Sequence, residues 1–138
     1  MKQKTQRNTR QRQSIYAAIV RAGRPLTPQE ILSFAQQEVP GLGIATIYRN
    51  IKVLLNDEAI RAVELPGEEL TRYEEAQSAH THHHHFLCKS CNRAFEVHGC
   101  AGDFNHMVPD GFKMHDHEIT LYGYCKECLQ KNVMRGKS

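Results

Sequence analysis

Apolar residues recur at helical spacing in the first third of the chain, which predicts short amphipathic helices. The first helix is expected from Thr9 to Arg21. Its buried face should carry Ile15, Ile19 and Ala22, with Tyr16 and Val20 alongside. The segment Thr27-Pro28-Gln29-Glu30 matches a capping box with proline at the first helical position. A second helix should therefore begin there and run to about Glu38.

A turn at Pro40-Gly41-Leu42-Gly43 precedes a third helix, expected from about Ala45 to Asp57. Its apolar stripe consists of Ile47, Ile51, Leu54 and Leu55. The opposite face is basic and aromatic and carries Tyr48, Arg49 and Lys52. Three short helices with such a face are typical of a helix-turn-helix, whose last helix enters the DNA major groove.

Two alternating segments follow the third helix, Ala59 to Leu65 and Leu70 to Glu74, joined by a turn at Pro66-Gly67. A hairpin directly after a recognition helix predicts a winged helix. Thr46 and Asn50 could reach base edges, whereas phosphates or a narrow minor groove suit Arg7, Arg49 and Lys52. An aromatic residue on a helix more often packs in a core, but Tyr48 lies off the apolar stripe, so it joins the candidate DNA contacts.

Charge is distributed unevenly, although the net formal charge is only +3. The basic residues that precede the first acidic residue are Lys2, Lys4, Arg7, Arg10, Arg12, Arg21 and Arg24. A basic end of this kind is typical of a protein that binds a polyanion, although such runs also serve solubility alone.

The composition changes after Glu75, because all nine histidines and all five cysteines follow it. Two Cys-x-x-Cys pairs, Cys88 with Cys91 and Cys125 with Cys128, have the spacing of a tetrahedral zinc shell. Buried or disulfide-linked thiols are the alternative, but a disulfide within such a pair closes only a tiny loop and stabilises little. We therefore predict structural zinc.

Histidines crowd just ahead of the first cysteine pair. In an extended strand His83 and His85 would share one face, while His82 and His84 would share the other, so the run could serve two metal ions. A solvated polar run or an expression tag is the alternative, but tags stand at chain ends. Imidazole titrates close to neutral pH, so a histidine site should bind metal more reversibly than four thiolates do.

Strands are expected at Phe86 to Cys88, Arg93 to Val97 and Glu118 to Tyr124, with a short helical segment around Ala101 to Met107. The predicted fold class is α+β, with a winged-helix DNA-binding domain at 1–75, a hinge at 76–79 and a small metal-binding α/β dimerisation domain at 80–138. This second domain is too small to bury a core by itself, so zinc and a partner subunit should complete it. A homodimer would place two winged helices on a palindromic operator in double-stranded DNA.

Motifs in order along nearly the whole chain resemble the ferric uptake regulator family. They are Arg7-x-Thr9-x-Gln11-Arg12, Gly43 to Asn50, Arg72-Tyr73-Glu74, His82 to Cys91, His117 to Cys125, and Cys128. The family consists of dimeric, metal-dependent bacterial transcription repressors. The resemblance implies structural zinc on Cys88, Cys91, Cys125 and Cys128. It implies a sensing site with Glu74, His83, His85 and Glu96, and a further metal site with His82, His84, Asp103 and His117.

Iron-sensing and peroxide-sensing relatives usually have a histidine just before the second helix, where this chain has Arg24-Pro25. Zinc-sensing relatives often use a residue of the hinge strand instead, which makes Glu64 a further candidate, and they often carry the four-histidine run. Many of them have a cysteine in place of Glu74, and a glutamate with two histidines also suits iron or manganese. As the sensed metal, Zn²⁺ is slightly favoured over Fe²⁺, and Mn²⁺ stays open.

We therefore predict a metal-dependent repressor of metal-uptake and homeostasis genes, in which metal fixes the angle between the two domains. The alternatives are a peroxide-sensing regulator of the same family and a zinc-ribbon adaptor that senses no metal. An enzyme is not expected, because no His-Glu-x-x-His or His-x-Glu with Pro-Cys-x-x-Cys motif is present. The N-terminus has no secretory signal and no apolar run approaches membrane-spanning length, so we expect a soluble cytoplasmic protein. We expect no small-molecule substrate.

Overall fold

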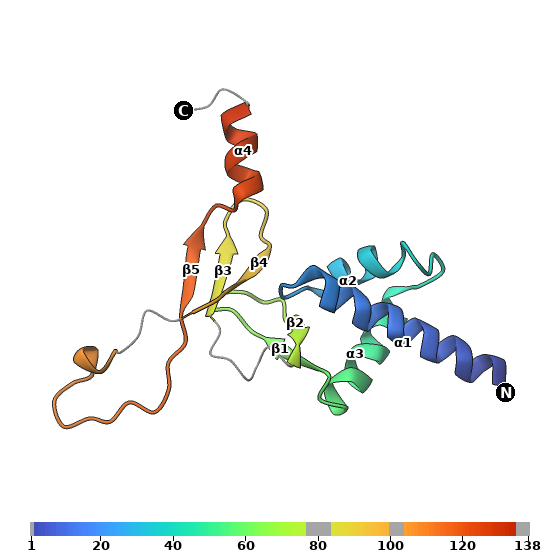
Figure 1. Cartoon of the computed structure of the whole chain (residues 1–138), viewed down its shortest axis with the longest axis horizontal. Coiled ribbons are helices and arrows are strands. Elements are labelled where there is room, and N and C mark those ends of the chain that lie inside the picture. The colour runs from blue at the N-terminus through green and yellow to red at the C-terminus, as the bar shows by residue number, and fades with distance from the viewer. Residues whose placement is uncertain (1, 77–83, 100–103, 135–138) are drawn as a thin grey trace. The chain divides into compact units, whose positions relative to one another are not determined.

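The computed structural model describes residues 2–76, 84–99 and 104–134, with the backbone alone at 2–5 and 132–134 (Figure 1). The chain divides into two compact units, Met1–Thr81 (unit 1) and His82–Ser138 (unit 2). Three predicted ligands, His82, His83 and Asp103, lie outside the described residues, as do residues 77–79 of the expected hinge.

Unit 1 contains three helices followed by a two-stranded hairpin. The helices are α1 (Lys2–Ala22), α2 (Pro28–Ala35) and α3 (Ile44–Asn56). The antiparallel hairpin joins β1 (Ile60–Val63) to β2 (Arg72–Glu75), with Val63 opposite Arg72. This order matches the winged helix expected from the sequence.

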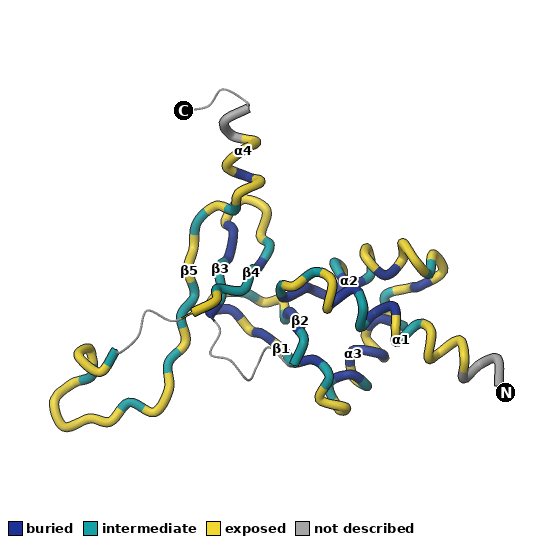
Figure 2. The backbone as a smooth tube through the Cα atoms, in the orientation of Figure 1, coloured by how far each residue is buried: buried dark blue, intermediate teal, exposed yellow. Residues whose placement is uncertain are grey.

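The core of unit 1 lies where its three helices meet. Its buried apolar side chains are Ile15, Ile19, Leu26, Ile31, Ala35, Leu42, Ile47, Ile51, Leu54 and Ile60. Leu26 also exchanges two backbone hydrogen bonds with Tyr73, at 2.9 and 2.8 Å, which fixes the hairpin beside the start of α2. Figure 2 shows the buried faces of the three helices in dark blue.

Two helix ends differ from the prediction. The first helix begins at Lys2 rather than Thr9, because the residues before Thr9 include neither glycine nor proline and are mostly good helix formers. The second helix ends at Ala35 rather than Glu38, because hydrogen bonds between residues three apart replace the α-helical pattern there. The Gln37 N–H donates to the Phe34 carbonyl, and the Glu38 N–H donates to the Ala35 carbonyl. The capping box of α2 is confirmed by both of its hydrogen bonds, 3.0 and 3.2 Å, between Thr27 and Glu30.

Unit 2 is built on a three-stranded sheet with the order β4-β3-β5. The central strand β3 (His84–Cys88) pairs antiparallel with β4 (Ala94–Val97) and parallel with β5 (Thr120–Gly123). Between β4 and β5 lies a short 3-10 helix at Asn105–Met107, within the helical segment expected there. The last element, α4 (Lys126–Met134), follows β5. The sequence had not predicted α4.

Few apolar side chains of unit 2 are buried. Among the described residues these are Leu87, Cys88, Ala94 and Cys128, whereas Leu121, Tyr122, Tyr124 and Leu129 are exposed. None of the helices in the described part of the chain is both long and apolar enough to cross a bilayer.

Candidate metal centre and DNA-binding surface

The four cysteines of the two Cys-x-x-Cys pairs come together at one end of the sheet of unit 2. Their sulfur atoms all lie within 4.8 Å of one another. The sulfurs of Cys88 and Cys128 are 3.7 Å apart, and those of Cys91 and Cys125 are 3.8 Å apart. A tetrahedron with metal–sulfur bonds of about 2.3 Å has edges of about 3.8 Å. The four side chains therefore fit a zinc ion, and their separation excludes disulfides.

Local backbone structure aims these sulfurs at one point. Cys88 ends β3, and the turn after it contains Asn92 in the left-handed region, φ 62°, which asparagine tolerates better than most residues. The N–H groups of Cys91 and Cys125 donate to the Cys88 sulfur over 3.5 and 3.3 Å. Cys128 lies in the first turn of α4, so the unpredicted helix presents the last ligand.

These backbone donors prepare the Cys88 sulfur for a metal ion. Burial of the thiol opposes its ionisation, but hydrogen bonds from backbone N–H groups, chiefly those of Cys91 and Cys125, outweigh burial and lower the pKa of Cys88 to about 6. A thiolate is the form that binds zinc. A hydrogen bond with the Ser90 side chain lowers the pKa of Cys128, but burial and hydrogen bonds with the neighbouring thiols outweigh it and raise the pKa to about 11.

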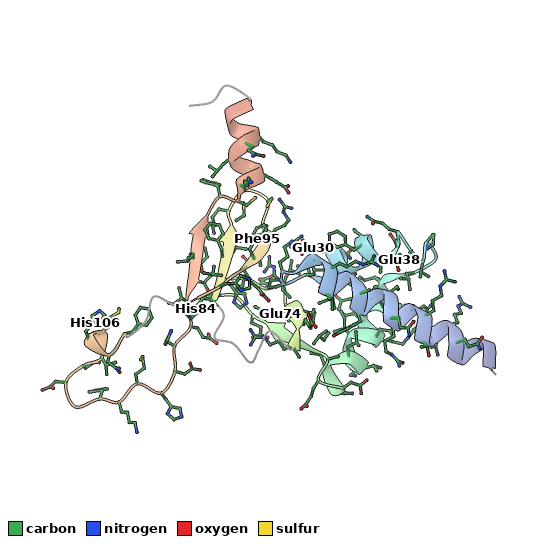
Figure 3. All side chains as sticks on the ribbon, in the orientation of Figure 1. Glu30, Glu38, Glu74, His84, Phe95 and His106 are labelled. Carbon is green, nitrogen blue, oxygen red and sulfur yellow. The ribbon has the colours of Figure 1, made fainter. Side chains whose placement is uncertain are left out.

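The histidines of β3 face opposite sides of the sheet. The side chain of His84 is buried, and its Nδ1 accepts a hydrogen bond from the Ile119 N–H over 3.2 Å (Figure 3). The His84 ring centroid lies 5.2 Å from that of His117, which in turn is 4.8 Å from Phe104. The structure thus brings together two of the four residues predicted for the further metal site, and the other two, His82 and Asp103, lie outside the described residues.

The residues predicted for the sensing site are distributed over both units. In unit 2, His85 lies directly opposite Glu96 in the β3–β4 pair, and His98 Nε2 is 3.9 Å from a Glu96 carboxylate oxygen. In unit 1, the Glu74 side chain is buried on β2, where it pairs with Arg61 over 3.1 Å, while Glu64 is exposed after β1. Within the described ranges, the four cysteines are the only group of three or more candidate ligands close enough to share an ion.

The exposed face of α3 has the basic and aromatic character that the sequence predicted. Tyr48 is 55% exposed, and Arg49 and Lys52 are exposed beside it. Thr46 is half-buried and its hydroxyl accepts a hydrogen bond from Arg49 over 3.1 Å.

Asn50 differs from the other candidate DNA contacts because its side chain is buried. Its amide donates to the Thr46 carbonyl over 2.9 Å, within the same helix. We therefore assign Asn50 to the packing of α3 rather than to the exposed surface.

Helix α1 extends the basic surface. A shallow depression between α1 and α3 is lined by Asn8, Gln11, Arg12, Arg49, Asn50 and Val53. A second depression on α1 includes Arg7 and Arg10. Sequence reasoning named Arg7 as a DNA contact but missed Asn8, Gln11 and Arg12 as neighbours of the α3 face. Their spacing of three and four residues along one helix was the available signal.

The fold and the sites define a winged-helix protein with a metal-binding second unit. Residues 3–122 match the model of the ferric uptake regulator family. The chain therefore belongs to this family, whose members are metal-responsive transcription regulators rather than enzymes.

Individual relatives cover most of the chain. It is 29% identical over 125 residues to the ferric uptake regulation protein of Campylobacter jejuni, covering 87% of this chain and 78% of that protein. It is 26% identical to the peroxide operon regulator of Bacillus subtilis, over 91% of this chain and 86% of that protein. Among solved structures, the Helicobacter pylori ferric uptake regulator, described as having three functional metal binding sites, aligns with a TM-score of 0.61 and 28% identity, over 86% of this chain and 79% of that one.

Proposed function

We propose that this chain is a homodimeric repressor that binds operator DNA when a regulatory divalent metal is present and thereby controls metal-uptake genes. The observation that carries the proposal is the exposed Tyr48, Arg49 and Lys52 face of α3, in a chain whose second unit gathers zinc-type ligands. Basic side chains bind phosphates, and a recognition helix of this kind fits the major groove.

The four-cysteine cluster is the proposed site of structural zinc. Its sulfur separations fit a tetrahedral ion, and four thiolates with no open position hold zinc rather than catalyse with it. The buried core of unit 2 is small among the described residues, so zinc would supply part of the folding free energy of that unit.

The proposed ligands of the regulatory metal in unit 2 are His83, His85 and Glu96. The pairing of His85 with Glu96 across two hydrogen-bonded strands supports this, because residues directly opposite one another have adjacent side chains. Glu74 and Glu64 remain candidates from the sequence. Imidazole and carboxylate suit Zn²⁺, Fe²⁺ and Mn²⁺, and we propose Zn²⁺ first because Arg24-Pro25 replaces the histidine that iron-sensing relatives usually have.

Dimerisation is proposed through unit 2. In the outer strand β5, Leu121 and Tyr122 are both about half exposed, and Tyr124 just after the strand is exposed as well. Such apolar side chains on the outer strand of a sheet favour burial against a second copy. A symmetric dimer would bind a palindromic operator with one α3 in each half-site.

The test is DNA binding by parent protein and by the double variant H83A/H85A. The variant should remain a folded dimer with its structural zinc, but added metal should no longer increase its DNA affinity. The control is H106A, because His106 lies in the 3-10 helix outside the proposed site. If H83A/H85A responds to metal as the parent does, these histidines are not the regulatory ligands.

A further inference from the structure

The four-cysteine cluster is not protected equally on all sides. Cys88 and Cys128 are buried, whereas Cys91 is the most exposed of the four and Cys125 the next. A chelator or an electrophile that reaches the zinc-bound sulfurs would therefore arrive first at Cys91 and Cys125.

The Arg93 side chain lies over these two sulfurs. Its Nε donates to the Cys91 sulfur over 3.1 Å, and Nη2 lies 3.6 Å from the Cys125 sulfur. The same Nη2 forms an ion pair of 2.8 Å with a carboxylate oxygen of Glu127 in α4. One planar guanidinium thus links the turn after β3 to the start of α4.

Local structure fixes Arg93 from both ends. Its backbone carbonyl accepts a hydrogen bond from the Cys88 N–H over 3.0 Å, so its main chain belongs to the first metal-binding turn. Its guanidinium carbon lies 5.6 Å from the centre of the Phe95 ring, and Glu127 holds the other side of the group. The contact with both sulfurs therefore costs little additional ordering of a flexible side chain.

In a zinc–thiolate centre, a charged hydrogen-bond donor changes how readily the sulfurs react and how tightly they hold the metal. Zn²⁺ with four thiolates carries an excess of negative charge, which makes the sulfurs nucleophilic and open to protonation, with loss of the metal. A charged N–H donor withdraws electron density from a thiolate and occupies one of its lone-pair directions. Groups that donate to metal ligands commonly change metal affinity 10- to 100-fold.

We propose that Arg93 is a positioning residue that protects the Cys91 and Cys125 edge of the zinc centre. It slows the release of zinc and the reaction of these two thiolates with electrophiles. This role rests on zinc binding by the cluster, and it is independent of which metal the chain senses.

The test compares the zinc-loaded parent with R93Q, R93K and E127Q, all in a C100S background so that only the four ligand cysteines react. One readout is the rate of zinc transfer to the chromophoric chelator pyridylazoresorcinol. The other is alkylation by iodoacetamide, with each modified cysteine located by peptide mass spectrometry. The control is R21Q, which removes an exposed arginine whose 2.8 Å ion pair with Glu38 lies in unit 1.

R93Q should release zinc roughly 10-fold faster than the parent, and Cys91 followed by Cys125 should be alkylated before Cys88 and Cys128. The rate of zinc release from R93K should lie between those of the parent and R93Q, because an ammonium keeps the charge but cannot bridge both sulfurs and Glu127 in one plane. E127Q should show a smaller increase, and R21Q none.

Two results would overturn the proposal. The first is a rate of zinc release in both R93Q and R93K equal to that of the parent. The second is faster alkylation spread evenly over the four cysteines, which would mean that Arg93 only supports the fold. If R93Q does not fold, the rates of zinc release and the order of alkylation in R93K and E127Q provide the test. A parent protein without bound zinc would reject the zinc assignment itself, and with it the role of Arg93.

Discussion

Arg61 and Glu74 face each other across the β1–β2 hairpin, where one guanidinium nitrogen lies 3.1 Å from one carboxylate oxygen and 3.4 Å from the other. Glu74 is only 1% exposed. A buried carboxylate needs a compensating positive charge, and in unit 1 Arg61 supplies it. The candidate metal ligand Glu74 is therefore neutralised by the protein itself.

The first prediction concerns stability. R61M should lower the free energy of unfolding of unit 1 by about 1–3 kcal/mol at pH 7, less than for a fully buried pair because Arg61 is partly exposed. E74Q in the same chain should recover part of the loss, because the double variant lacks the buried carboxylate that Arg61 pairs with in the parent. Urea denaturation of the parent, both single variants and the double variant measures this coupling. A loss in R61M/E74Q equal to the sum of the losses in the two single variants would show that the pair contributes no coupling energy.

The second prediction concerns metal binding by Glu74. If Glu74 is a ligand of the regulatory metal, the metal competes with Arg61 for its carboxylate. Added Zn²⁺ should then raise the melting temperature of R61M more than that of the parent. Thermal melts at increasing free zinc measure the difference, with R61M/E74Q as the control that lacks the carboxylate. An identical zinc response in all three proteins would remove Glu74 from the ligand set.

The third prediction separates DNA contact from helix packing on α3. R49A and K52A should weaken DNA binding at all sequences, and each should reduce the slope of log affinity against log salt concentration by about one. N50A should instead lower the melting temperature, because it removes a buried amide that bonds to the Thr46 carbonyl. Fluorescence anisotropy over a salt series, together with thermal melts, distinguishes the two effects. An unchanged salt slope in R49A would exclude that side chain from phosphate contact.

The fourth prediction concerns alkaline pH. Burial, with the nearby Glu75 carboxylate at 3.3 Å, raises the pKa of Tyr16, and burial likewise raises the pKa of Tyr73. The folded state then holds these protons more tightly than the unfolded state. Their contribution to stability is fully present below about pH 10 and is lost as the pH rises through the folded-state values. Y16F should flatten the fall of unfolding free energy above pH 10, and an unchanged pH profile would contradict this.

The fifth prediction concerns removal of zinc. Chelation should greatly increase amide hydrogen exchange in β3, β5 and α4, because Cys88 ends β3, Cys125 lies between β5 and α4, and Cys128 lies in α4, so a shared zinc ion would tie these elements together. Exchange in α1 to α3 should change little, since the core of unit 1 is built from its own apolar side chains. Hydrogen exchange with mass spectrometry reports both units in one experiment. Equal loss of protection in unit 1 would contradict this view of the cluster.

Much of the fold was predictable because periodic signals are local. The stripe from Ile47 to Leu54 identified α3, and the capping box at Thr27 and Glu30 marked the start of α2 to the residue. The same stripe could also have predicted that Asn50 is buried, because Asn50 lies three residues after the buried Ile47 on the same face of the helix. The meeting of the four cysteines followed from their spacing and is confirmed.

The elements that were missed lack such signals. Helix α4 is short and mostly exposed, with Leu129 51% exposed, so its sequence shows no clear apolar stripe. The roles of Arg61 and Arg93 depend on strand register and on contacts between segments far apart in the chain. Neither residue stands in a motif, and only the folded arrangement brings them to Glu74 and to the cysteine sulfurs.

The most direct test of the central claim is metal-dependent DNA binding. A random pool of DNA duplexes would be offered to protein that carries only its structural zinc, and then to the same protein with added Zn²⁺, Fe²⁺ or Mn²⁺ under anaerobic conditions. We predict enrichment of a palindromic sequence only after the regulatory metal is added, with Zn²⁺ the most effective. Equal DNA binding with and without all three metals would contradict a metal-dependent regulator.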